Sequence, residues 1–237
     1  MIVLALDSTA VAASVALCDD EKMLASYTVC IGNTHSETLL PMVESVLRTA
    51  HLTPDDIDLF ACSVGPGSFT GVRIGVATVK GLAFGKEKPC VAVSTLEALA
   101  YNLVGFEGIA CPVMNARRSQ VYNALFEVNT KEVRRLTPDR AVSIEDLAAE
   151  LANETRPIHF CGDGYELMRE GLAQRVISTP AVLIPENACS VAVCALAKYR
   201  AGESVTDVAL TPVYLRLSQA ERERIEKEQK NQQDTGI

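Results

Sequence analysis

The chain has 237 residues, a formal net charge of −8 at pH 7 and an apolar content of 48%. No apolar run approaches the roughly 20 residues that span a bilayer as a helix, and the acidic balance disfavours tight independent binding to nucleic acid, whose phosphates attract cationic side chains. The first seven residues lack the basic start of a signal peptide, and the eight cysteines include no Cys-x-x-Cys pair. We therefore expect a cytoplasmic protein with reduced thiols and no membrane contact.

The first half of the chain is expected to be a mixed α/β unit that opens with a β-hairpin. The predicted elements in chain order are a hairpin within 1–17, a strand at 22–30, a helix at 34–50, a strand at 59–64, a helix ending near 84, a strand at 90–93 and a helix at 95–103. Thr34 and Glu37 have the spacing of a capping box at the start of the first helix. Pro41 cannot donate a helical hydrogen bond, which predicts a kink or a later start.

A glycine-rich turn, Gly65-Pro66-Gly67-Ser68-Phe69-Thr70-Gly71, joins the strand at 59–64 to the next helix. Backbone N–H groups at a helix start favour anions, so the turn is a candidate phosphate cradle, although it lacks the Lys-Ser/Thr of a P-loop. Asp7 could orient metal-bound water at the same site or, alternatively, begin an Asx turn. The residues assigned to this vestigial phosphate or nucleotide site are Asp7, Ser8, Gly65, Gly67 and Ser68.

The same motif supports a second interpretation, a docking surface. Gly71 and Gly75 share one face of the predicted helix and would leave a shallow groove for another helix, with apolar contacts from Val72, Val76 and Val79. The residues alone leave both interpretations open.

An internal repeat opens the second half. Residues 5–17 align without a gap with residues 113–125, with Asp7 opposite Asn115, and each copy has the pattern of a hairpin whose Asx residue begins the turn. The elements predicted after it are a helix at 144–152, a strand at 158–161, a helix from about 165, a helix at 188–201 and a strand at 212–215. Two such lobes predict a duplicated α/β fold of the actin-like or sugar-kinase-like type. The predicted division is 1–106 for the first lobe, 107–217 for the second, whose last helix could pack back on the first, and 218–237 for a charged tail.

Several segments of the chain together resemble the TsaB family. They are Asp7-Ser8-Thr9, His35-Ser36-Glu37, the block from Gly65 to Gly75, the segment from Val93 to Ala100, Asn115-Ala116-Arg117-Arg118 with Val121-Tyr122, and the segment from Pro212 to Arg216. The resemblance covers about residues 1–216 and implies the same duplicated actin-like fold. It also implies a function, because members of the family are bacterial subunits needed for threonylcarbamoyl modification of the tRNA adenosine next to the anticodon.

The resemblance implies a noncatalytic subunit. The related transferase TsaD carries a His-x-x-x-His metal pair, and the matching positions here are Thr95 and Leu99, which are poor metal ligands. Asn115 and Ser119 depart from the Asp and Gly that are common in the family, which weakens a phosphate or metal role for the second hairpin. No catalytic residue, metal or cofactor is therefore assigned.

In the family, two neighbouring helices of the first lobe form the face used for a homodimer or for TsaD. The matching residues are Leu39, Leu40, Val43, Val46, Gly71, Arg73, Gly75, Val76, Ala77 and Lys80. The implied function is docking to and activation of a TsaD-type transferase, which moves the threonylcarbamoyl group from threonylcarbamoyl-AMP to N6 of adenosine 37 in tRNA. A TsaE-type ATPase is expected in the same complex, and contact with tRNA is expected to be indirect or weak.

Two other functions stay open as alternatives. An autonomous actin-fold ATPase or small-molecule kinase would use Asp7 and the glycine-rich turn to bind nucleotide with magnesium. A peptidase would need a nucleophile and a base, yet the serines near these motifs have no evident histidine partner. Arg117-Arg118 and Arg134-Arg135 are candidates either for a local basic patch or for ordinary solvated surface.

Overall fold

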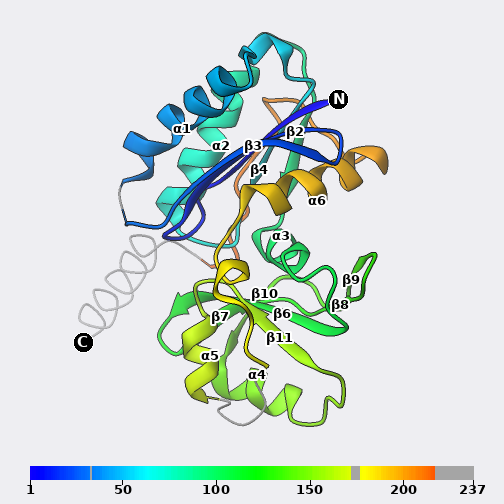
Figure 1. The fold of residues 1–237 in the computed structure, drawn as a ribbon. Helices are drawn as coiled ribbons and strands as arrows, with labels where there is room; N and C mark the ends of the chain where they lie inside the picture. The colour runs from blue at the N-terminus through cyan, green and yellow to red at the C-terminus, as the bar shows by residue number, and fades with distance from the viewer. Residues whose placement is uncertain (33, 172–176, 217–237) are drawn as a thin grey trace, which may run out of the picture.

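The computed structural model describes residues 1–32, 34–171 and 177–216, and the tail predicted at 218–237 lies outside these ranges. Two α/β lobes stand one above the other in Figure 1, with helix α3 (Thr95–Tyr101) between them. Within the described ranges, no helix is long and apolar enough to cross a membrane.

The first lobe is built on a five-stranded sheet with the order β3-β2-β1-β4-β5. Its strands are β1 (Ile2–Asp7), β2 (Ala13–Asp19), β3 (Lys22–Val29), β4 (Leu59–Ser63) and β5 (Cys90–Val93). The first three are antiparallel neighbours, whereas β4 pairs in parallel with both β1 and β5. The turns that follow β1 and β4 therefore meet at the same edge of the sheet.

Helices cover both faces of this sheet because its central strands place apolar side chains on both sides. The covering helices are α1 (His35–Thr49), α2 (Phe69–Ala83) and α6 (Ala188–Arg200). Leu4 and Leu6 of β1 belong to the core shared with α1 and α2. Val3 and Ala5 of the same strand belong to the core shared with α6, which packs on the first lobe although it comes late in the chain (Figure 1).

The second lobe has a six-stranded sheet with the order β10-β7-β6-β8-β9, in which β11 also pairs with β6. Its strands are β6 (Gly108–Arg117), β7 (Gln120–Asn123), β8 (Phe126–Val128), β9 (Val133–Arg135), β10 (Arg140–Ser143) and β11 (Ile158–Cys161). The helices α4 (Ile144–Leu151) and α5 (Tyr165–Gly171) share one core with this sheet, and α3 shares the other and also contacts α6. Two short 3-10 turns lie at Pro54–Asp56 and Ala181–Leu183.

The two lobes share the design that the internal repeat predicts. Each opens with an antiparallel hairpin, β1–β2 or β6–β7, whose first strand pairs in parallel with β4 or β11. Asp7 Oδ1 accepts a hydrogen bond from the Thr9 N–H at 2.9 Å, and Asn115 Oδ1 accepts one from the Arg117 N–H at 2.8 Å. The same Asx turn thus recurs at matching positions, and the duplicated actin-like fold is confirmed.

Several local predictions need correction. Helix α1 begins at His35 and runs through Pro41, so the later start is wrong; the proline is exposed and its ring faces solvent. The capping box is also wrong, because the Thr34 carbonyl, not its hydroxyl, accepts the Glu37 N–H at 2.9 Å. The strand predicted at 212–215 is irregular chain. The sequence patterns did not predict the short strands β8, β9 and β10.

Candidate functional site

The turn between β1 and β2 packs into the start of α2. The Thr9 carbonyl accepts a hydrogen bond from the Ser68 N–H at 2.6 Å, and the Ser8 hydroxyl donates one to the Gly71 carbonyl at 2.9 Å. A Cβ atom at Gly71 would lie 2.0 Å from the Ser8 carbonyl oxygen, and one at Gly75 would lie 2.6 Å from the Ser8 hydroxyl oxygen. The two helical glycines therefore make room for a turn of this chain and do not form an open groove for another helix.

Asp7 is an internal structural residue. It is 1% exposed, its Oδ1 also accepts the Thr9 hydroxyl at 2.8 Å, and its Oδ2 accepts the Ser63 hydroxyl at 2.5 Å. Burial raises the pKa of the Asp7 carboxyl, and the hydrogen bonds from Ser63 and Thr9 oppose that rise. Of the two roles considered for Asp7, the geometry is that of the Asx turn.

The predicted phosphate site is occupied in large part by the chain itself. Ser68 gives its N–H to the Thr9 carbonyl, and its hydroxyl oxygen caps α2. A Cβ atom at Gly67 would lie 2.5 Å from the same Thr9 carbonyl, and one at Gly65 would lie 2.4 Å from the Val213 carbonyl. An anion at the start of α2 would have to displace these contacts.

The ten residues predicted for the docking face separate into two groups. Those buried inside the first lobe are Leu39, Val43, Val46, Gly71, Gly75 and Val76. Leu40, Arg73 and Ala77 are exposed, and Lys80 is half-buried. The apolar stripes of α1 and α2 thus face their own sheet, and only the second group is available to a partner.

Arg73 and Lys80 have a further role, because they hold the C-terminal segment, residues 203–216, against α2. The Arg73 Nε donates to the Tyr214 hydroxyl at 2.8 Å, and the guanidinium lies 3.9 Å from the ring centre of Phe69, which stacks on Tyr214. The Lys80 ammonium donates to the carbonyls of Val208 and Leu210 at 2.8 and 3.1 Å. The segment then crosses to the second lobe.

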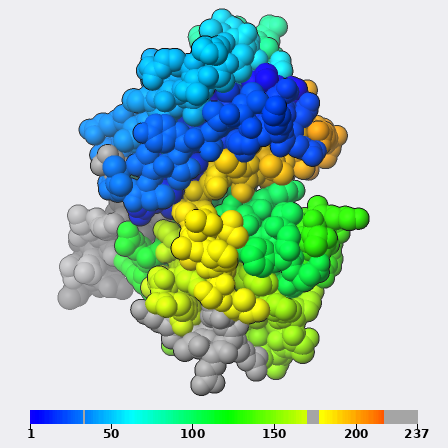
Figure 2. All heavy atoms as spheres, in the orientation of Figure 1, coloured from blue at the N-terminus to red at the C-terminus, as the bar shows by residue number. Residues whose placement is uncertain are grey.

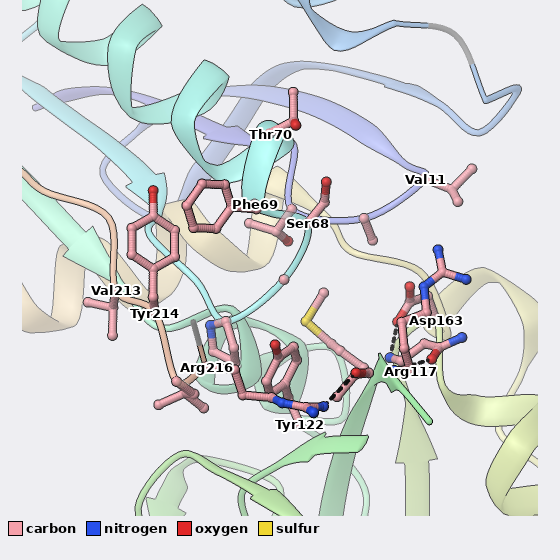
Figure 3. Close-up of a pocket in the computed structure, with 18 residues that line it drawn as sticks. Val11, Ser68, Phe69, Thr70, Arg117, Tyr122, Asp163, Val213, Tyr214 and Arg216 are labelled. Carbon is pink, nitrogen blue, oxygen red and sulfur yellow. Dashed lines mark hydrogen bonds between the residues drawn. The ribbon is translucent and has the colours of Figure 1, made fainter. Parts of the chain in front are cut away.

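A pocket of about 470 Å³ lies between the lobes (Figure 3). The β1–β2 turn and the glycine-rich turn line it from the first lobe, and the β6–β7 turn with Asp163 lines it from the second. Tyr214 and Arg216 of the C-terminal segment complete the wall, and the Arg216 Nη1 donates to the Ala116 carbonyl at 2.8 Å. Its volume is within the range of small-ligand sites.

The other residues considered for chemistry are also used within the fold. His35 Nε2 lies 2.6 Å from the Ala10 carbonyl and so fastens the β1–β2 turn to α1. Thr95 and Leu99 are buried in α3, and the Ser94 hydroxyl donates to Asp139 at 2.6 Å. In the part of the chain that the structure describes, no group of three or more His, Cys, Asp or Glu side chains is placed to hold a metal ion.

Glu186 is a buried acid that the sequence patterns do not reveal. It lies just before α6. The segment that leads into this helix, yellow in Figure 2, lies where the two lobes meet. The residue is 2% exposed, and its Oε1 has no hydrogen-bond partner. Burial, together with the nearby carboxylates of Asp7 and Asp163, raises the pKa of Glu186 to about 8.

Comparison with known proteins defines the family. The family model for TsaD, described as a tRNA N6-adenosine threonylcarbamoyltransferase, matches residues 30–224. The Bacillus subtilis protein TsaB, described as a tRNA threonylcarbamoyladenosine biosynthesis protein, is 33% identical over 95% of this chain and 99% of its own length. The chain belongs to the TsaB family.

The further relatives include both TsaB proteins and transferases. TsaB of Haemophilus influenzae is 28% identical over 90% of this chain and 92% of its own length, and a transferase from Novosphingobium aromaticivorans is 44% identical over 28% of this chain and 19% of its own. The structure of YeaZ from Pseudomonas aeruginosa superposes with a TM-score of 0.76 at 30% identity, covering 90% of this chain and 99% of that one. A second structure, described as an uncharacterized protein with similarity to the peptidase YeaZ from Pseudomonas aeruginosa, gives a TM-score of 0.75 at 29% identity, covering 91% and 99%.

Proposed function

We propose that this chain is a noncatalytic subunit of tRNA threonylcarbamoyladenosine biosynthesis that docks to a TsaD-type transferase in the cytoplasm. Transfer of the threonylcarbamoyl group from threonylcarbamoyl-AMP to N6 of adenosine 37 would take place on that partner. Family membership carries the proposal, because relatives matched over nearly their whole length bear this pathway in their names. A TsaE-type ATPase would join the complex, and two copies of this chain would pair through the same face when the partner is absent.

The internal use of reactive groups supports the noncatalytic role. The Asp7 carboxylate closes an Asx turn, and the Ser8 and Ser68 oxygens hold the start of α2. A peptidase would need one of these hydroxyls free beside a base. The two positions that match the metal-binding histidines of TsaD, Thr95 and Leu99, are buried inside α3.

The proposed docking surface is the exposed side of the two neighbouring helices of the first lobe. We define the α1–α2 face as Leu40 and Glu44 of α1 with Arg73, Ala77 and Gly81 of α2. Leu40 is 54% exposed, which is high for a leucine on a helix that otherwise turns its apolar stripe inward. The small side chains at Ala77 and Gly81 would let a partner helix approach closely, and Glu44 and Arg73 offer charges of both signs for orientation.

The docking proposal predicts that Ala77→Glu weakens association with a TsaD-type partner by about 100-fold, because a long charged side chain would stand where the small alanine lets a partner helix approach. The matched control is Ala197→Glu, an exposed alanine on α6. Size-exclusion chromatography with light scattering measures association, and circular dichroism confirms that both variants fold. Undiminished association of Ala77→Glu would exclude this face, and tRNA modification in a reconstitution that lacks the chain would exclude the subunit role.

The autonomous ATPase or kinase alternative predicts magnesium-dependent nucleotide binding by the isolated chain. We expect titration calorimetry with ATP and magnesium to show no such binding. The Ser68 N–H, which a phosphate at the start of α2 would use, already donates to the Thr9 carbonyl. Stoichiometric binding that Ser8→Ala or Ser68→Ala removes would favour the alternative.

A further inference from the structure

The β6–β7 turn carries two arginines whose backbone has an unusual, left-handed conformation. Arg117, Arg118 and Ser119 have φ angles of 65°, 53° and 56°. These angles lie in the left-handed region, which residues other than glycine seldom occupy. The Asn115 side chain holds the turn by accepting the Arg117 N–H, and Asp163 Oδ1 accepts the Asn115 N–H at 2.8 Å. The turn is therefore fixed from both sides.

Neither guanidinium group of this turn forms an ion pair with a described residue, although the positive charge of Arg117 opposes the rise in the Asp163 pKa that burial causes. Among the described residues, no ion pair or hydrogen bond joins the side chain of Arg117 or Arg118 to another residue, although most other arginines of the second lobe are paired with glutamate or aspartate. Arg117 and Arg216 both line the pocket, together with one acid, Asp163, and Arg118 follows Arg117 in the turn. A local excess of positive charge thus exists on a chain whose net charge is −8.

Aromatic rings line the same pocket as Arg117 and Arg216. Figure 3 shows Arg216 and Tyr122 along the lower side of the pocket, with Phe69 and Tyr214 on the opposite side. Tyr214 is 41% exposed, and its stacking on Phe69 with a centroid distance of 4.3 Å fixes its ring. Arginines bind phosphates, and exposed rings stack on unpaired bases; this combination is typical of single-stranded RNA recognition. An acidic protein surface could pair with the arginines, but it would leave the aromatic rings without a stacking partner.

We propose that the arginine turn, Arg117 and Arg118 with Arg216, binds phosphates of an unpaired RNA segment whose bases reach the aromatic wall of the interlobe pocket. The inference rests on the proposed function, in which the RNA is the tRNA held by the complex. Two or three phosphate contacts are too few for firm binding by an acidic chain alone. The turn therefore adds affinity to a complex that the partner has already assembled with RNA.

The test compares two double variants of this chain in complex with a TsaD-type partner. In Arg117→Gln/Arg118→Gln the unpaired arginines lose their charge. In the control, Arg134→Gln/Arg169→Gln, two exposed arginines that pair with Glu127 and Glu166 lose theirs, so both variants change the net charge equally. Fluorescence anisotropy with a labelled tRNA transcript gives Kd over a series of salt concentrations from about 50 to 200 mM.

We expect the Arg117/Arg118 variant to bind tRNA about tenfold more weakly near 150 mM salt, with a log Kd against log salt slope shallower by about 1.4, since two contacts to single-stranded phosphates are lost. The control should match wild type. Equal affinity and slope for both variants would overturn the proposal, as would displacement of the tRNA from this site by millimolar AMP, which would make the ligand a free nucleotide.

Light scattering of the same samples separates this inference from the docking proposal. A variant that assembles normally but keeps full tRNA affinity overturns the RNA contact and leaves the docking proposal intact. If wild type does not assemble with the partner, docking fails, and the same anisotropy series on the isolated chain at about 20 mM salt decides the RNA contact. A difference between the two double variants there supports it, and none overturns it.

Discussion

Replacing Gly71 by alanine is expected to destabilise the protein by about 3 kcal/mol, although alanine is the better helix former. The new Cβ atom would lie 2.0 Å from the Ser8 carbonyl oxygen, which is backbone and cannot rotate away. Either α2 or the β1–β2 turn must move, and with it the hydrogen bonds between Ser8 and Gly71 and between Ser68 and Thr9. Urea unfolding followed by circular dichroism measures the loss.

The same helix supplies the matched control. Gly81 lies near the other end of α2, is exposed, and a Cβ atom there would meet nothing within 4 Å. Gly81→Ala should therefore stabilise the protein by about 0.5–1 kcal/mol through helix propensity. Opposite signs for the two substitutions are the expected result. A stabilising Gly71→Ala would mean that the β1–β2 turn does not pack on α2 in solution.

A second large effect is expected at Glu186, where Glu186→Gln should stabilise the protein increasingly as the pH rises. The folded state holds this carboxyl protonated up to about pH 8, whereas its ordinary pKa is 4.5. The carboxyl therefore does not destabilise wild type below pH 4.5. Between pH 4.5 and 8 the free energy of unfolding of wild type falls progressively, because the unfolded state ionises this group and the folded state does not. Glutamine is neutral throughout, so the difference should grow from near zero to about 3 kcal/mol at pH 7.

Comparison of the two proteins across pH reports the titration that depends on Glu186. Asp7 also has a raised pKa, and because its charge acts on Glu186, the difference includes the coupling between these two acids. Glu166→Gln, at an exposed position of α5, is the matched control for the substitution itself. Urea unfolding at pH 5, 6, 7 and 8 measures the trend. A difference between wild type and Glu186→Gln that does not change with pH would show that the buried carboxyl is already ionised.

Much of the fold could be predicted because its signals are local or repeated. The apolar run before Gly65, the serine at the start of α2 and the helical spacing of apolar residues each act within a few residues. The internal repeat then links the two hairpins through Asp7 and Asn115, and this predicts the duplicated lobes. Strands β8, β9 and β10 were missed because three or four residues are too few to show a twofold alternation.

The candidate site was harder to predict because its features depend on distant parts of the chain. Helical spacing reveals an apolar stripe, but it cannot tell whether Val43 or Val76 faces its own sheet or a partner. The glycines of α2 have the spacing of a docking groove, and only the fold brings Ser8 into it. Glu186 is buried beside two acids that are more than 20 residues away in sequence, and no local sequence pattern predicts that these side chains lie close together.

The late position of α6 has a consequence for how the protein is made. One face of the first sheet, with Val3, Ala5 and Leu59, gets its cover from a helix that ends only at residue 200. While the ribosome is still translating the second lobe, this face lacks α6 and has only Ala98 and Tyr101 of α3 in its core, so the first lobe cannot complete that core as an independent unit during synthesis. A nascent chain of 106 residues would expose this apolar surface, and the order of translation leaves it open until nearly the whole message has been read.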